Sequence, residues 1–182
     1  MKTAIVFLAD GFEECEGLLT VDLLRRAEVN VIMASIMDRT EIKSSHGITL
    51  KADMLAEDVD FALADMVVLP GGLPGTTYLG ESGIVKEQCK AFAKDKYVAA
   101  ICAAPSVLAS LGLLEGKAAT CHPAFEGKMA GAVVTKEAVT VAGNIITGQG
   151  LGAGIPFALK LVEILVDKDA ADKIAAAISY KA

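Results

Sequence analysis

The stretch "YVAAICAAPSVLAS", residues 97–110, joins an apolar run to a segment of small residues. The run 97–102 is typical of a parallel strand that is buried on both faces. The small residues after it predict a helix from about Ala104. A strand that leads directly into a helix is the unit from which parallel sheets are built, so this stretch indicates an α/β fold.

Apolar runs alternate with amphipathic segments along the rest of the chain. We predict strands over 3–9, 29–36 and 66–72, helices over 12–28, 83–95, 155–166 and 169–180, and a hairpin over 138–148 with its turn near Gly143 and Asn144. Residues 39–53 predict a small β-excursion between the second and third strands. The expected architecture is one domain over residues 1–182, with a doubly wound, mostly parallel sheet between helices.

Composition and charge argue against several classes of function. The chain has 182 residues, of which 53% are hydrophobic, and a net charge of −6. A sequence-independent nucleic-acid binder needs a basic face, and docking on anionic membranes needs one too, so neither partner is expected. The uncharged runs 97–114 and 138–157 are interrupted by proline or glycine and are not expected to span a membrane. The first apolar run is too short for a signal peptide, which predicts a cytoplasmic protein.

The four cysteines, Cys15, Cys89, Cys102 and Cys121, show no CxxC spacing. With only two histidines in the chain, the sequence predicts no structural zinc site and no resident metal. Free thiols are expected in a reducing compartment. Cys15 and Cys89 fall on predicted helices, where we expect both to pack in the interior.

Ligands of open α/β sheets bind at the carboxyl ends of the strands. The first predicted strand is followed closely by Glu13, Glu14 and Glu16, the third ends in Gly71-Gly72, and the fourth ends at Cys102. We therefore expect these groups to share one edge of the sheet.

Cys102 has two interpretations. As a nucleophile it would occupy a sharp strand-to-helix turn, where the following helix N-terminus favours a thiolate. The backbone N–H groups of Gly72 and Ala103 could then form an oxyanion hole. As a structural residue it would be a small buried hydrophobe, which is what most cysteines are.

Two further side chains could assist this thiol. An ionised Glu16 would raise the pKa of Cys102, whereas a protonated Glu16 would donate a hydrogen bond and lower it. The useful arrangement is therefore a neutral, partly buried Glu16. His122 is a candidate acid–base group or, equally, a helix-capping or surface residue. Glu13 and Glu14 need no function beyond the helix dipole, and the glycine-rich run 148–154 lacks a P-loop pattern and is interpreted as a tight turn.

Several segments together resemble a known family. They are "LADGFEECE", "VVLPGG", "AAICAAPSVLA", "CHPAFEGKM" and "TGQGLGAGIPFALKLVEIL", in this order along nearly the whole chain. They are similar to the ThiJ/PfpI superfamily, and within it to the branch of the parkinsonism-associated protein DJ-1 and its bacterial relatives. The resemblance implies a flavodoxin-like sandwich, a homodimer and no cofactor.

The resemblance also implies roles for individual residues. Cys102 corresponds to a reactive cysteine of low pKa, Glu16 to a protonated acid that hydrogen-bonds it, and His122 to a nearby histidine. Gly72 and Ala103 correspond to the backbone oxyanion donors. In the peptidase-like branch a histidine follows the cysteine; here Ala103 follows it, so proteolysis is not expected. Close relatives often carry an arginine where this chain has His46, so an anion-binding role is not carried over to that position.

Two functional hypotheses follow from the resemblance. In the first, the chain is a cysteine-dependent enzyme of the glutathione-independent glyoxalase or deglycase type, which converts methylglyoxal or its early adducts to lactate. In the alternative, it is a redox sensor or stress-protective protein that is switched by oxidation of Cys102 to the sulfinic acid.

Overall fold

A computed structural model describes residues 1–181 and centres on a seven-stranded sheet with the order β10-β11-β7-β6-β1-β2-β5. The strands are β1 (Thr3–Leu8), β2 (Asn30–Ser35), β5 (Met54–Leu55), β6 (Met66–Leu69), β7 (Tyr97–Ile101), β10 (Val139–Ala142) and β11 (Ile145–Gly148). The β10–β11 hairpin is antiparallel, and the other neighbouring strands pair in parallel. The α/β class and the mostly parallel sheet are therefore confirmed.

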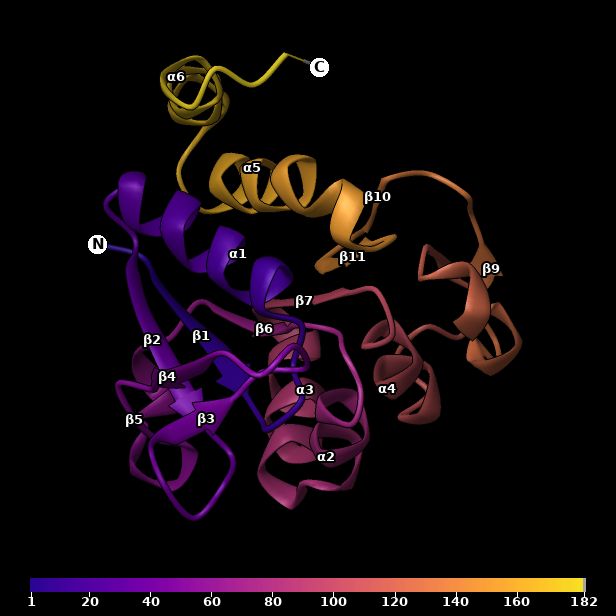
Figure 1. The fold of residues 1–182 in the computed structure, drawn as a ribbon. Coiled ribbons are helices and arrows are strands. Elements are labelled where there is room, and N and C mark those ends of the chain that lie inside the picture. Colours follow the sequence, from indigo (N-terminus) through magenta and orange to yellow (C-terminus); the bar gives the residue numbers. More distant parts are fainter. Residues whose placement is uncertain (182) are drawn as a thin grey trace.

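Helices cover both faces of this sheet (Figure 1). One face carries α1 (Glu14–Arg26), α5 (Gly154–Leu165) and α6 (Lys168–Ala177). The other carries α2 (Gly75–Glu81), α3 (Gly83–Asp95) and α4 (Pro105–Ser110). No helix within residues 1–181 combines the length and the apolar character needed to cross a membrane.

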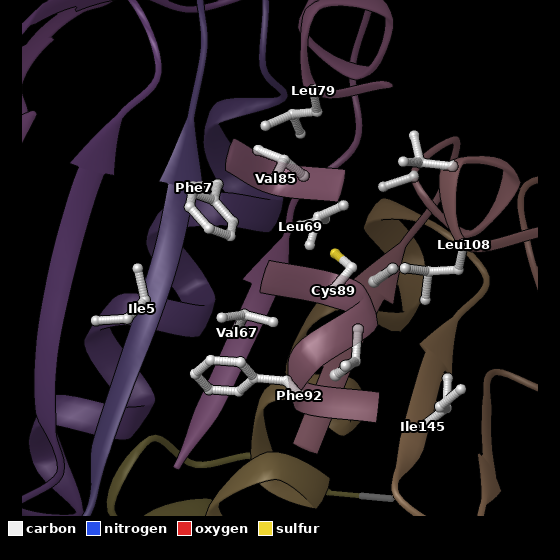
Figure 2. Packing of buried hydrophobic residues seen from close by; sticks show 14 of the residues in the cluster. Ile5, Phe7, Val67, Leu69, Leu79, Val85, Cys89, Phe92, Leu108 and Ile145 are labelled. Atoms are coloured by element: carbon white, nitrogen blue, oxygen red, sulfur yellow. The ribbon is translucent and has the colours of Figure 1, made fainter. Parts of the chain in front are cut away.

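The alternation of side chains along the strands divides the core into two layers. Ile5 and Phe7 of β1 pack toward α3, where Cys89 and Phe92 lie among buried apolar side chains (Figure 2). Val6 of β1 belongs to the layer beneath α1 and α5. Because both faces are covered, β1 is buried along its whole length.

The predicted excursion is the antiparallel hairpin of β3 (Glu41–Lys43) and β4 (Thr49–Lys51). A second small sheet pairs β8 (Ala118–Ala119) with β9 (Val133–Val134). Short 3-10 helices are η1 (Ala56–Asp58), η2 (Phe61–Leu63), η3 (Pro123–Lys128) and η4 (Leu151–Ala153). The third predicted segment, 66–72, ends in a Pro-Gly-Gly turn by its sequence, and accordingly β6 ends at Leu69 and these three residues are loop.

The expectation that Cys15 packs in the interior was wrong. Cys15 is exposed, as is Leu18 one turn later, while Glu16, Thr20 and Leu23 on the opposite face of α1 are buried. Helical spacing therefore separates Cys15 from the core side of its own helix. Cys89 on α3 is fully buried, as expected.

Candidate active site

Cys102 is the first residue after β7 and has a backbone φ of +64°. This is the left-handed region, which is uncommon for a residue with a side chain and marks a strained position. Neighbouring segments hold the turn: the Cys102 N–H donates to Gly148 O at 3.0 Å, and the Cys102 carbonyl accepts from His122 N at 2.8 Å. The thiol therefore lies on a sharp strand-to-helix turn, as the sequence predicted.

Two backbone N–H groups, those of Ala103 and Gly72, lie beside the Cys102 sulfur and act to lower its pKa. Gly72 has a φ of +90°, and a Cβ there would lie 2.3 Å from the Glu13 N atom. Only glycine fits this loop, because a side chain would collide with backbone. The two predicted oxyanion donors thus converge on the thiol from two different loops.

Glu16 reaches the same place from the first turn of α1. It is only 1% exposed, and its Oε2 accepts a hydrogen bond from Gly71 N at 3.0 Å. Its carboxyl group also interacts with the Cys102 thiol, while Oε1 has no nitrogen or oxygen partner within residues 1–181. A Cβ on Gly71 would lie 2.6 Å from both Glu16 Oε2 and Cys102 Cβ. Sequence analysis missed this requirement for glycine at position 71.

Burial raises the pKa of Glu16 to about 7. Burial and, after it, the adjacent Glu16 carboxylate together raise the pKa of Cys102 to about 12, against the two backbone donors. The low thiol pKa implied by the resemblance is therefore absent while Glu16 is charged. Once Glu16 is protonated, the repulsion disappears and the carboxyl O–H can donate to sulfur. A thiolate at Cys102 is therefore favoured only while Glu16 is neutral.

Glu13, Glu14 and His46 form the outer part of the site. Glu13 caps α1 by accepting from Glu16 N at 2.7 Å. Glu14 is buried, and its Oε1 lies 3.0 Å from Nδ1 of His46 on the β3–β4 turn. Burial alone would raise the pKa of Glu14, but hydrogen bonds from its own backbone, Ser44 and Ser45 and the charge of His46 lower it. These three ligand-bearing side chains approach within 4.8 Å and are the set that could hold a metal ion.

His122 is placed in a way that fits both of its interpretations. Its Nδ1 accepts from Ala124 N at 3.2 Å and so caps η3. With Nδ1 as acceptor, the proton of the neutral ring lies on Nε2. A Cβ on Gly150 would lie 3.5 Å from His122 Cδ2 and 4.0 Å from Cys102 Sγ, so the ring edge and the sulfur flank the same glycine.

These groups line a pocket of about 510 Å³. Its lining residues are Glu13, Glu16, His46, Cys102, His122, Pro123, Ala138, Gln149, Gly150, Leu151, Gly152 and Ala153. The run 148–154, which the sequence predicted to be a tight turn, therefore supplies one wall. Gly148 does pack closely, since a Cβ there would lie 2.9 Å from Ile101. No residue pattern in the run had indicated that it borders the thiol.

Comparison with known proteins identifies relatives of this chain over nearly its whole length. The model of the DJ-1/PfpI family matches residues 2–164. The chain is 37% identical over 177 residues to "Protein DJ-1 homolog A" of Arabidopsis thaliana, covering 95% of this chain but only 45% of that protein's length. It is 33% identical over 169 residues to "Glutathione-independent glyoxalase DJR-1.2" of Caenorhabditis elegans, covering 90% of this chain and 89% of that protein. The structure of oxidized DJ-1 from Toxoplasma gondii superposes with a TM-score of 0.96 at 35% identity over the whole of both chains.

Proposed function

Because the chain belongs to the DJ-1/PfpI family, we propose that it is a cysteine-dependent enzyme that converts 2-oxoaldehydes such as methylglyoxal, or their early adducts, to 2-hydroxy acids without glutathione. The nematode relative that is 33% identical carries the name of such a glyoxalase. The principal support is chemical and lies in the surroundings of Cys102.

The observation that carries the proposal is the pairing of Cys102 with Glu16. The sulfur receives two backbone N–H groups, which suit a thiolate and then a negatively charged oxygen on the carbon attached to it. The carboxyl group beside it has a pKa of about 7, so it can both accept and give up a proton near neutral pH. An inert buried cysteine needs neither feature.

The proposed reaction begins when the Cys102 thiolate attacks the aldehyde carbon. A C–S bond forms, the carbonyl π electrons move to oxygen, and neutral Glu16 protonates that oxygen, which gives a hemithioacetal and leaves Glu16 as a carboxylate. The Glu16 carboxylate removes the proton from the former aldehyde carbon, and the resulting enediol takes a proton at the former ketone carbon. The first carbon becomes a thioester and the second carries a hydroxyl group.

Water then hydrolyses the thioester and restores the thiol. Methylglyoxal plus one water gives lactate, so no external oxidant or reductant is consumed. The ring of His122 borders the pocket and is our candidate for activating this water.

The direct test is formation of D-lactate and L-lactate from methylglyoxal without glutathione. Wild type should give many lactate molecules per protein molecule, and Cys102→Ser should lose at least about a thousandfold in kcat/KM, as expected when the nucleophile is removed. Cys15→Ser is the matched control, because Cys15 is exposed and does not line the pocket. Absence of lactate above background with wild type, or full turnover with Cys102→Ser, would overturn the proposal.

A second candidate function is a sensor that responds to peroxide. The structural relative from Toxoplasma gondii is an oxidized protein, which supports oxidation as an alternative role, and Cys102 is the thiol that we propose for it here. One peroxide would convert the Cys102 thiolate to sulfenate and become water or hydroxide, and a second would give the sulfinate. Stoichiometric conversion of Cys102 by mass spectrometry, without lactate formation, would favour the sensor.

A further inference from the structure

The pocket around Cys102 has an unusual balance of charge for a site that stabilises negative oxygen. Glu13 and Glu16 line it, together with His46 and His122, and no lysine or arginine is among its lining residues within 1–181. Lys43 and Lys136 lie on neighbouring segments but are exposed and outside the pocket. Its positive groups are therefore N–H donors and whichever imidazole carries a second proton.

Four of the N–H donors near Cys102 are already committed, two at the start of α1 and two beside the sulfur. The start of α1 faces the pocket, but Glu16 N donates to the Glu13 carboxylate at 2.7 Å, and Glu13 N donates to Gly71 O at 2.8 Å. The N–H groups of Gly72 and Ala103 point at the sulfur. A negative charge on the reacting oxygen is thus accommodated, whereas a second negative charge on the α1 side of the pocket meets the carboxyl groups of Glu13 and Glu16.

His46 cannot balance the negative charge of the pocket carboxylates by itself, because it already pairs with Glu14. Its Nδ1 lies 3.0 Å from the Glu14 carboxylate and 3.2 Å from the Ser45 hydroxyl, so its ring is turned toward a buried acid of the protein. Any positive charge on His46 is matched by Glu14. The carboxylates of Glu13 and Glu14 both lie within 4.8 Å of this one imidazole, so the cluster keeps a net negative charge, and like charges at such short range oppose binding.

We propose that Glu13, with His46 held against Glu14, forms a charge filter at the mouth of the pocket that admits uncharged carbonyl compounds and rejects anionic ones. His46 is a specificity-determining residue in this filter. The consequence for substrate choice rests on the proposed function: a 2-oxoaldehyde without a carboxylate would be accepted, and its carboxylate-bearing analogue would not.

The first test does not depend on turnover. Cys102 is alkylated with neutral iodoacetamide or anionic iodoacetate, in which the sulfur–carbon bond forms and iodide leaves, and the rates are followed by peptide mass spectrometry. Relative to the same ratio for N-acetylcysteinamide, wild type should favour iodoacetamide by about tenfold or more. His46→Arg and Glu13→Gln should bring this ratio close to that of the small thiol.

Thr49→Arg is the matched control for His46→Arg. Thr49 is exposed on the same hairpin and does not line the pocket, so the variant also adds a positive charge but should leave the ratio unchanged. A wild-type ratio within twofold of the small thiol would overturn the filter. So would an equal response to His46→Arg and Thr49→Arg, because the effect would then come from overall charge.

The second test compares two substrates that differ in one group. 2-Oxopentanal and 4,5-dioxopentanoate have the same chain, ending in a methyl group or a carboxylate, and are converted to 2-hydroxypentanoate and 2-hydroxyglutarate. The neutral compound should have the higher kcat/KM by about tenfold or more, and His46→Arg should narrow this gap. Selective alkylation without turnover of either compound would support the filter and refute the enzyme, whereas equal turnover of both without selective alkylation would do the reverse.

Discussion

The surroundings of Cys89 and Cys102 show what separates a structural thiol from a candidate reactive one. Each thiol has a pKa raised to about 12, with burial as the largest cause. Around Cys89 the neighbours are apolar side chains of the sheet and α3, as Figure 2 shows, and burial is the whole cause. Around Cys102 there are also a carboxyl group and two N–H donors.

The two thiols differ in whether protonation of a neighbouring side chain can change how easily the thiol ionises. Near Cys89 nothing compensates a thiolate, so the thiol stays neutral. Near Cys102 the charge of Glu16 opposes the thiolate, and protonation of Glu16 converts this opposition into a hydrogen bond. Burial makes both thiols unreactive in isolation, and the partners of Cys102 make its reactivity conditional.

The largest expected effect follows from replacing the Glu16 carboxyl group by an amide, which has nearly the same shape but cannot carry the proton. Glu16→Gln should lower kcat/KM for methylglyoxal by about a thousandfold, because an amide cannot carry the proton between two carbons. The variant should still react with peroxide at Cys102, since the amide N–H can donate to sulfur. Lactate assays and mass spectrometry of the same preparation measure both. Full turnover by Glu16→Gln would remove Glu16 from the proposed mechanism.

The second effect is on stability and has a defined sign. Glu16 has a pKa of about 7 in the folded chain against an ordinary value of 4.5, so the folded state holds a proton that the unfolded state releases between these values. The free energy of unfolding should therefore fall as pH rises from 4.5 to 7, by up to roughly 3 kcal/mol from this group. Below pH 4.5 and above pH 7 it should contribute no further change.

Urea unfolding of wild type and Glu16→Gln across this range provides the measurement. The difference between the two curves isolates the carboxyl group, because the amide does not titrate. As pH rises from 4.5 to 7, the free energy of unfolding of wild type should fall relative to that of Glu16→Gln. Parallel curves would mean that Glu16 titrates alike in both states and that its burial does not raise its pKa.

The position of the site was predictable from the sequence, but its requirements for space were not. Cys102, Gly72 and Glu16 follow β7, β6 and β1, and these strands are adjacent in the sheet, so the rule that ligands bind at strand ends brought them together. The helix α2 was not predicted, since its sequence "GTTYLGE" is poor in strong helix formers and tertiary packing decides its state. The role of the run 148–154 as a wall of the pocket depends on contacts between distant parts of the chain that no local pattern encodes.

The homodimer that the family resemblance implies stays a prediction.

The third prediction tests the close approach of Gly71 to Cys102. Gly71→Ala places a methyl group 2.6 Å from Glu16 Oε2 and from Cys102 Cβ. Forcing these groups apart should destabilise the chain by about 2 kcal/mol and lower turnover, because the thiol and carboxyl group can no longer keep their spacing. Gly83→Ala is the control: a Cβ there meets nothing within 4 Å, and the change should be neutral or slightly stabilising. Thermal melts and lactate assays on both variants separate strain at the site from a general effect of losing glycine.

The smallest effect, and the one that tests the comparison most directly, is at Cys89. Cys89→Ser puts a hydroxyl group among apolar side chains and should lower the free energy of unfolding by about 1 to 2 kcal/mol. Cys89→Ala should lose a similar amount through the small void it leaves. Both should keep wild-type kcat/KM, because no member of the buried cluster that contains Cys89 lines the pocket within residues 1–181. If either variant stayed folded by circular dichroism and lost turnover, the division into a structural and a reactive thiol would be wrong, since packing on the α3 side of the sheet would then control the strand end that carries Cys102.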